Sequence, residues 1–192
     1  MKSAPKKDHQ TVSSKDHIES PAPKIETDEI FENDIERDKK LPRRRLARER
    51  VMQMLYARAL NGSDVDKLFR EMVVNDIGDD ALALEFAKEL TFQLTSHEEE
   101  TKKLITERLR HWDFSRIALI DRILIEIGIT ELRYFPEIPP KATINELIEI
   151  AKDFSTDDSG KFINGILHAV MTQLSEEGDL NKTGRGLIDR TL

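Results

Sequence analysis

The 192-residue chain contains no cysteine, few aromatic residues and no long hydrophobic run. Without cysteine there can be no disulfide, no zinc finger, no iron–sulfur ligation and no thiol catalysis. The most apolar stretch, residues 117–129, is interrupted by Asp121, Arg122 and Glu126, and it falls short of the roughly 18 apolar residues that a membrane span needs. The polar N-terminal segment lacks the apolar core of a secretory signal. We therefore expect a cytoplasmic protein with no membrane partner, which also fits the lack of cysteine.

The motifs of metal and nucleotide sites are missing as well. No two histidines have the i, i+4 spacing of a helical metal site, and no glycine-rich loop precedes a basic helix. The acidic runs Glu98–Glu100 and Asp157–Asp158 stand at expected helix starts, where carboxylates complement the helix dipole. We predict no catalytic residue, no metal ligand and no cofactor, and hence a binding protein rather than an enzyme.

Charge is distributed unevenly along the chain. The net charge is −7, from 30 basic and 37 acidic residues, but residues 41–50 alone hold five arginines and one glutamate. A chain this acidic is not a general polyanion binder, so a nucleic-acid site must be a local patch. The arginine block is the candidate for that patch.

The composition predicts one folded domain between two tails. Residues 1–40 have few, unclustered apolar residues and cannot offset their ordering entropy, so we predict a disordered N-terminal tail. Residues 178–192 have three glycines and no apolar period, which indicates a flexible C-terminal tail. The helical domain then covers residues 41–177.

Apolar residues in this domain recur with the period of an α-helix, and no window shows sustained strand alternation. We expect an all-α fold of six or seven helices. The expected helix starts are Pro42, Ser63, Asp79 or Asp80, Thr101, Asp113, Thr143 and Asp157–Ser159. The helix from Asp79 or Asp80 is expected to turn Leu82, Phe86, Leu90 and Leu94 inward. The wide stripe around Ile120–Ile127 predicts a central helix that is contacted on more than one side.

The arginine block begins the first of these helices, after Pro42. Arg44, Arg45 and Arg48 lie within one turn of each other, and guanidinium groups suit phosphates. The alternative is a solvated helix start, although cations disfavour a helix N-terminus. Tyr56 lies two turns after Arg48 on nearly the same face, and could equally be a residue at the edge of the core.

A second candidate lies at the start of the last helix. Lys161 and Phe162 could contact RNA backbone and stack on an unpaired base. The alternative for Phe162 is an anchor in the core. Asn164, one turn later, offers an amide that could read a base edge.

Four segments, in this order and spacing, resemble the family of the transcription antitermination protein NusB. They are Arg43–Tyr56, Arg116–Leu124 with Thr130–Leu132, Pro140–Lys152 and Ser159–Leu167. The resemblance implies a NusB-like fold of two small packed helical bundles. It also implies binding of single-stranded boxA-type RNA from ribosomal RNA operons, together with the ribosomal protein NusE, within an RNA polymerase antitermination complex that includes other Nus factors.

The resemblance further implies which residues bind RNA. The family's RNA contacts would fall on Arg44, Arg45, Arg48, Tyr56 and the segment Asp158–Asn164, chiefly Lys161 and Phe162. Leu46 stands where the family often has a basic residue, and Arg43 adds charge nearby. The predicted RNA-binding residues are therefore Arg43, Arg44, Arg45, Arg48, Tyr56, Asp158, Lys161, Phe162 and Asn164.

Contacts with the ribosomal protein are expected on the central helix, at Asp121 and Glu131, because acids suit a basic partner. Two other classes stay open. One is a protein-interaction scaffold, for which the arginines would be dispensable. The other is the RNA-binding module of a methyltransferase system, although the chain leaves no room for a cofactor domain. The sequence does not decide between monomer and homodimer.

Overall fold

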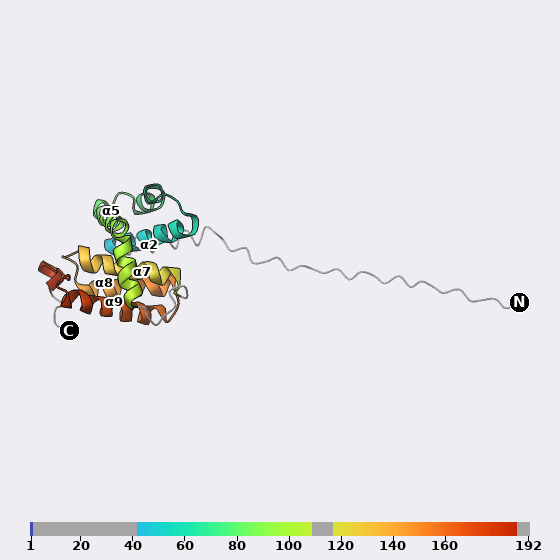
Figure 1. Cartoon of the computed structure of the whole chain (residues 1–192). Coiled ribbons are helices and arrows are strands. Elements are labelled where there is room, and N and C mark those ends of the chain that lie inside the picture. Colours follow the sequence, from blue (N-terminus) through green and yellow to red (C-terminus); the bar gives the residue numbers. More distant parts are fainter. Residues whose placement is uncertain (2–41, 109–116, 188–192) are drawn as a thin grey trace. The chain divides into compact units, whose positions relative to one another are not determined.

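The computed structural model of the chain describes Met1, residues 42–108 and residues 117–187 (Figure 1). The chain divides into two units, residues 1–37 and 38–192, and everything below concerns the second unit. The predicted N-terminal tail and the predicted helix start at Asp113 lie outside the described residues. Within the described ranges no helix is both long and apolar enough to cross a membrane.

Every regular element of the described ranges is helical, which confirms the all-α fold. The elements are α2 (Arg43–Asn61), α3 (Val65–Leu68), a π-helical stretch η1 (Phe69–Val74), α4 (Asn75–Ile77), α5 (Ala81–Ser96), α6 (Glu98–Arg108), α7 (Leu119–Tyr134), α8 (Pro140–Phe154), α9 (Ser159–Glu176) and a 3₁₀ turn η3 (Gly184–Leu187).

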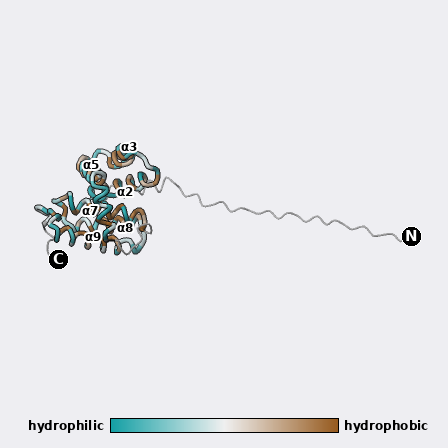
Figure 2. The backbone as a smooth tube through the Cα atoms, viewed as in Figure 1, coloured by the Kyte–Doolittle hydropathy of each residue, from teal (hydrophilic) through white to brown (hydrophobic). Residues whose placement is uncertain are grey.

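The helices form two bundles that share α7. In the first bundle α2 packs against α5, α3, η1 and α4; in the second, α7, α8 and α9 pack against one another, with α6 beside α7 and α9. Both α2 and α5 also contact α7, so this helix joins the bundles (Figure 1). Hydrophobic and hydrophilic residues alternate along the helices at the outside of the body (Figure 2), as expected for helices with one buried face.

Helix α7 confirms the prediction of a central helix. Ten of its sixteen residues are buried, on all sides of the helix. Gly128 permits the closest approach, because a Cβ atom there would lie 2.6 Å and 2.7 Å from the methyl carbons of Leu167 and 2.9 Å from a methyl carbon of Leu147. The absence of a side chain at Gly128 therefore sets how tightly α8 and α9 pack on α7.

Three of the predicted helix starts are shifted in the structure. Helix α6 begins at Glu98 rather than Thr101. The side chain of Asp64, not that of Ser63, caps α3 by accepting a hydrogen bond from the Lys67 amide at 2.9 Å. Helix α8 begins at Pro140 rather than Thr143, because proline has the φ of a first helical turn and needs no N–H partner there. The start at Asp80 is confirmed, since its carboxylate accepts from the amide of the third residue of α5.

One predicted core residue of α5 lies outside the core. Leu82 is 62 % exposed, whereas Phe86 and Leu90 are buried as expected. The inward stripe of α5 begins at Ala83 instead, one residue later. Ala83 is small, so hydropathy alone favoured the leucine beside it.

The segment after α9 folds back onto the body as far as residue 187, unlike the expected flexible tail. We call residues 179–187 the C-terminal clasp. Lys182 is 6 % exposed, and its Nζ donates to the main-chain oxygens of Glu131 at 3.0 Å and Phe135 at 2.9 Å. The amide of Thr183 donates to the oxygen of Pro136 at 2.9 Å. This segment has no apolar period, because polar bonds hold most of it and Leu180 is the apolar side chain that packs against the core.

The close approach at Gly128 gives a first prediction. Gly128→Ala should lower the free energy of unfolding by about 1–3 kcal/mol, because its methyl group overlaps the side chains of two leucines. The matched control is Gly165→Ala in α9, where no atom lies within 4 Å of the added carbon. That control should gain about 0.5–1 kcal/mol from helix propensity. Urea denaturation measures both, and equal effects would contradict the packing around α7.

Lys182 gives a second prediction, on pH. Burial lowers the pKa of Lys182 to about 8, whereas an unfolded lysine titrates near ~10.4. Between these values the unfolded chain binds more protons, so Lys182 makes the free energy of unfolding rise with pH. Below the pKa that Lys182 has in the folded chain, its ammonium is charged in both the folded and the unfolded state. The free energy of unfolding is then reduced by the full cost of burying this charge.

In the Lys182→Met variant the free energy of unfolding should therefore no longer rise with pH in this range. The Lys103→Met variant, changed at an exposed position of α6, should still show the rise. Denaturation curves between pH about 7 and 10.5 provide the comparison. An unchanged rise in Lys182→Met would contradict the buried position of the amine.

Candidate nucleic-acid interface

Helix α2 begins without any of the groups that usually satisfy a helix N-terminus. Pro42 is the N-cap residue, no side chain caps the helix, and the first turn contains no acid. Three consecutive arginines, Arg43, Arg44 and Arg45, occupy that turn instead. The partial positive charge of the helix end and three guanidinium groups thus lie together, which favours a bound anion.

Each of these arginines is paired with a carboxylate from another element. Arg43 lies 3.0 Å from Asp80, and Arg44 lies 3.1 Å from Glu137. Arg45 donates two hydrogen bonds to Glu146, at 2.6 Å and 3.0 Å. The hydrogen bonds that Glu146 accepts raise the pKa of Arg45 above its ordinary value. Arg43 and Arg44 are exposed and Arg45 is partly buried, so all three can reach a ligand by exchanging partners.

Arg48 does not belong to this surface, contrary to the prediction. Its side chain is 3 % exposed and donates to both oxygens of Glu131, at 2.5 Å and 2.8 Å. The hydroxyl of Thr143 donates to the same carboxylate at 2.8 Å. The network ties α2 to α7 and α8 inside the core. The helical period explains the error, because Arg48 lies seven residues before the buried Leu55 and shares its face.

Tyr56 lies on α2 and is 37 % exposed. It follows Arg45 by eleven residues, about three helical turns and roughly 16 Å, on nearly the same face. Arg45, rather than Arg48, is therefore the arginine that shares a side of α2 with Tyr56. The ring is available at the surface, as a base-stacking role requires.

The start of α9 supplies the second part of the predicted surface. Its N-cap residue Asp158 makes no side-chain capping bond, and its first turn contains no acid. Lys161 and Asp158 are 88 % and 93 % exposed, with 3.8 Å between the ammonium and the carboxylate. Phe162 is partly buried against the core and Asn164 is half-buried. Phe162 thus packs against the core without being fully covered by it.

Helix α8 lies between the two parts. Glu146 of α8 binds Arg45, and two residues later Ile148 lies 3.3 Å from the position of a Cβ atom on Gly160 in α9. The beginnings of α2 and α9 therefore both flank the middle of α8. Of the predicted RNA-binding residues, Arg43, Arg44 and Arg45 therefore form one group at the start of α2. Asp158, Lys161 and Phe162 form a second group at the start of α9, and α8 separates the two groups.

The two acids predicted to contact a protein partner are buried. Glu131 is fully buried in the network with Arg48. Asp121 is 7 % exposed and accepts hydrogen bonds from Ser155 at 2.6 Å and Ser159 at 2.8 Å, which fixes the turn before α9. Neither carboxylate faces solvent. Because Asp121 and Glu131 both face the interior, each carboxylate needs an internal partner.

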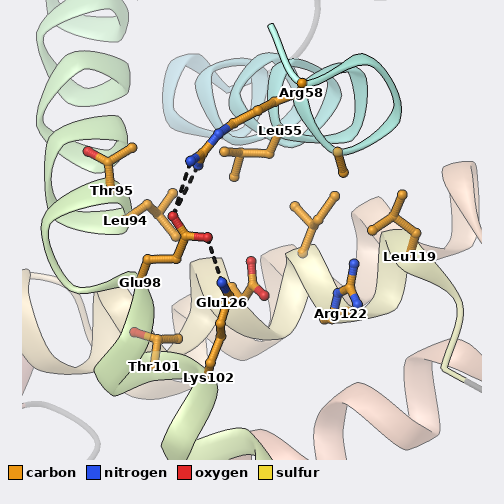
Figure 3. A pocket seen from close by; sticks show the side chains of 13 residues that line it. Leu55, Arg58, Leu94, Thr95, Glu98, Thr101, Lys102, Leu119, Arg122 and Glu126 are labelled. Atoms are coloured by element: carbon orange, nitrogen blue, oxygen red, sulfur yellow. Dashed lines mark hydrogen bonds and ion pairs between the residues drawn. The ribbon is translucent and has the colours of Figure 1, made fainter. Parts of the chain in front are cut away.

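A cavity of about 460 Å³ lies elsewhere, between α2, α5, α6 and α7 (Figure 3). Its charged groups are Arg58, Lys102, Arg122, Glu98 and Glu126. One oxygen of Glu98 accepts from the two terminal nitrogens of Arg58, each at 3.2 Å, and the other accepts from Lys102 at 2.7 Å, so these groups satisfy one another. Burial raises the pKa of Glu126. None of the predicted RNA-binding residues lines this cavity.

Two of the acids that face the arginines, Glu137 and Glu146, had no assigned role in the sequence pattern. The signal was weak, because these residues are 93 and 101 positions away from the arginines they bind. Only the packing of α8 beside α2 brings them together.

Comparisons with known proteins agree with this architecture. The model of the NusB family matches residues 45–172. The transcription antitermination protein NusB of Salinibacter ruber is 41 % identical over 145 residues, which cover 76 % of this chain and 91 % of the relative. A crystal form of NusB from T. maritima has a TM-score of 0.62 at 32 % identity, over 70 % of this chain and 93 % of that one.

A further solved structure contains the antitermination factors NusB and NusE in complex with double-stranded RNA. It has a TM-score of 0.62 and 27 % identity to this chain, and it covers 68 % of this chain and 97 % of its own.

The buried position of Arg48 gives a third prediction. Arg48→Ala should lower the free energy of unfolding by about 3–5 kcal/mol, because it leaves the Glu131 carboxylate buried without its counter-charge. Arg43→Ala removes the same charge from an exposed pair and should cost no more than about 1 kcal/mol. Chemical denaturation of both variants tests the difference. If both substitutions lowered the free energy of unfolding by a similarly small amount, the buried position of Arg48 would be contradicted.

Proposed function

The chain belongs to the NusB family, and on that premise we propose that it is a transcription antitermination factor that binds RNA at the starts of α2 and α9. Antitermination and RNA binding follow from the relatives, whose names describe transcription antitermination proteins and one of which was solved with NusE and RNA. Most of the proposed RNA surface lies within residues 45–172, which match the family. Arg43 and Arg44 come immediately before this range.

The observation that carries the proposal is the first turn of α2. A helix start with three arginines, no side-chain cap and no acid is unfavourable for the isolated protein. A phosphate there would accept hydrogen bonds from unsatisfied amides and from guanidinium groups. The local cost to folding is therefore offset when an anion binds.

RNA binding at this turn is an exchange of ionic partners. Asp80, Glu137 and Glu146 occupy the arginines in the free protein. The phosphodiester backbone of RNA carries successive phosphates and can replace several carboxylates at once, which a single inorganic anion cannot do. Lys161 provides another phosphate contact, while Tyr56 and the accessible part of Phe162 offer rings for stacked bases.

We further propose that the RNA is a single-stranded boxA-type element, read by stacking and by the Asn164 amide. Unpaired bases expose the faces that aromatic rings need, whereas a double helix hides them. The RNA in the related complex is double-stranded. The affinity of the chain should therefore be measured for both single-stranded and double-stranded RNA.

The partners proposed for the chain are the ribosomal protein NusE and the RNA polymerase antitermination complex with its other Nus factors. The net charge of −7 complements a basic ribosomal protein. With Asp121 and Glu131 buried, contacts with NusE must use other residues. The proposed action is binding rather than catalysis, and it takes place in the cytoplasm, where bacterial transcription occurs.

The fourth prediction separates RNA binding from a scaffold role. Replacing Arg44 and Arg45 together by Gln removes two phosphate contacts from the surface. The slope of log affinity against log salt should become shallower by about 1.4, at about 0.7 per contact with a single strand. Fluorescence anisotropy with a boxA-like RNA across a salt series measures this slope.

The control replaces Lys88 and Lys103 by Gln, which changes the net charge equally at exposed positions of α5 and α6. Its salt slope should match that of the unaltered chain. Phe162→Leu keeps an apolar side chain in the core but removes the ring, so RNA affinity should fall by about 1–3 kcal/mol. Unchanged RNA binding in both the arginine variant and Phe162→Leu would leave the scaffold as the better explanation.

A further inference from the structure

The C-terminal clasp, residues 179–187, lies against the turn that connects α7 to α8. Gly178 has a positive φ of 78° and reverses the chain after α9. The amides of Asp179 and Leu180 then donate to the oxygen of Leu174, which starts the return path. The clasp lies beyond residue 172, where the match to the family ends.

Lys182 of the clasp binds the end of α7. The oxygens of Glu131 and Phe135, which accept from its ammonium, lie one turn apart at the C-terminus of that helix. Helix C-termini present unsatisfied carbonyls and a partial negative charge, so a buried ammonium is well placed there. The contact joins the clasp to the last turn of α7.

Gly186 fits the clasp against the adjacent turn. A Cβ atom at Gly186 would lie 2.1 Å from the main-chain oxygen of Pro136, a distance that no side chain tolerates. Thr183 donates its amide to that same oxygen. Backbone contact at Gly186 and the bond from Thr183 thus hold Pro136 from one side.

The residue after Pro136 is Glu137, the carboxylate that pairs with Arg44 of the proposed RNA surface. Arg44 also lies over the ring of Phe86, 5.1 Å from its centre, and Phe86 packs edge-on against Phe135 of the same turn. A short path of contacts therefore leads from the clasp through Pro136 and Glu137 to Arg44.

We propose that the C-terminal clasp is an autoinhibitory element that holds Glu137 against Arg44 and so lowers the affinity of the chain for RNA. This inference rests on the proposed function, since it concerns the same arginine surface. Docking of the clasp fixes the turn and with it the carboxylate that competes with phosphate. Release of the clasp frees Glu137, and Arg44 becomes available to RNA.

The coupling works in both directions. If the docked clasp weakens RNA binding, then bound RNA must weaken docking of the clasp by the same factor. RNA at Arg44 displaces Glu137, and the turn loses the ion pair that helps to keep it in place. The clasp then opens more often in the RNA complex than in the free chain.

The fifth prediction uses the full chain with Gly186→Ala, which undocks the clasp by steric overlap. Its affinity for the boxA-like RNA should rise about two- to fivefold, the range that one exposed ion pair is worth. Lys182→Gln should act in the same direction through a different contact. Lys103→Gln, at an exposed position of α6, should have no effect. Circular dichroism and thermal melting report whether each variant is folded.

The path through Glu137 is tested by combining substitutions. Glu137→Gln should raise RNA affinity by a similar factor, and adding Gly186→Ala to it should give no further rise. A clasp with a merely structural role would change affinity equally in both backgrounds. A fall in affinity for Gly186→Ala, or full additivity with Glu137→Gln, would overturn the proposal.

Hydrogen exchange provides an independent readout. In the unaltered chain, RNA should speed exchange of the amides of Thr183 and Gly186, which are hydrogen-bonded in the free protein. Slower or unchanged exchange there, in a complex that forms, would overturn the proposal while leaving RNA binding intact. No RNA binding by the unaltered chain would instead overturn the proposed function, and the role of the clasp with it.

Discussion

The buried ion pair between Arg48 and Glu131 holds the two bundles together. It joins positions 83 residues apart, and both side chains are almost completely excluded from solvent. Two desolvated charges are tolerable only when each finds several partners, and here Thr143 adds a hydrogen bond to the carboxylate. Lys182 binds the main-chain oxygen of the same glutamate. Helices α2, α7 and α8 and the C-terminal clasp therefore meet at one residue, and their relative positions depend on it.

The RNA surface is built outward from this pair. Arg48 anchors the first half of α2 in the core, and the preceding turn consequently presents Arg43, Arg44 and Arg45 beside α8. Glu137 and Glu146 lie there because α8 begins at Pro140, one turn after the end of α7. The same geometry that exposes the arginines thus gives each of them an internal competitor. An acidic protein that neutralises its own basic patch binds selectively to ligands with several phosphates in a row.

Sequence alone predicted the elements whose signals are local. The apolar period, together with Pro42 before α2 and Asp80 before α5, identified those helices, and the apolar stripe of α7 identified the centre of the fold. Residues whose role depends on distant partners could not be assigned in this way. A run of arginines in the sequence predicts a basic patch on the surface. Arg48 belongs to this run, yet its side chain lies in the core. Lys182 sits in a polar, glycine-rich segment that has no apolar pattern, and only the carbonyls at the end of α7 explain its burial.

The central position of α7 also has a consequence for synthesis of the chain. Helices α2 and α5 are complete by residue 96, yet the helix that covers their inner faces ends only at residue 134. At about 5–20 residues per second, the ribosome needs several seconds to supply the missing segment. During that interval the parts of α2 and α5 that contact α7 have no partner from their own chain. The nascent protein therefore passes through a partly folded intermediate with exposed apolar surface, which chaperones can bind. Folding is completed only when the helices of the second bundle have been synthesised.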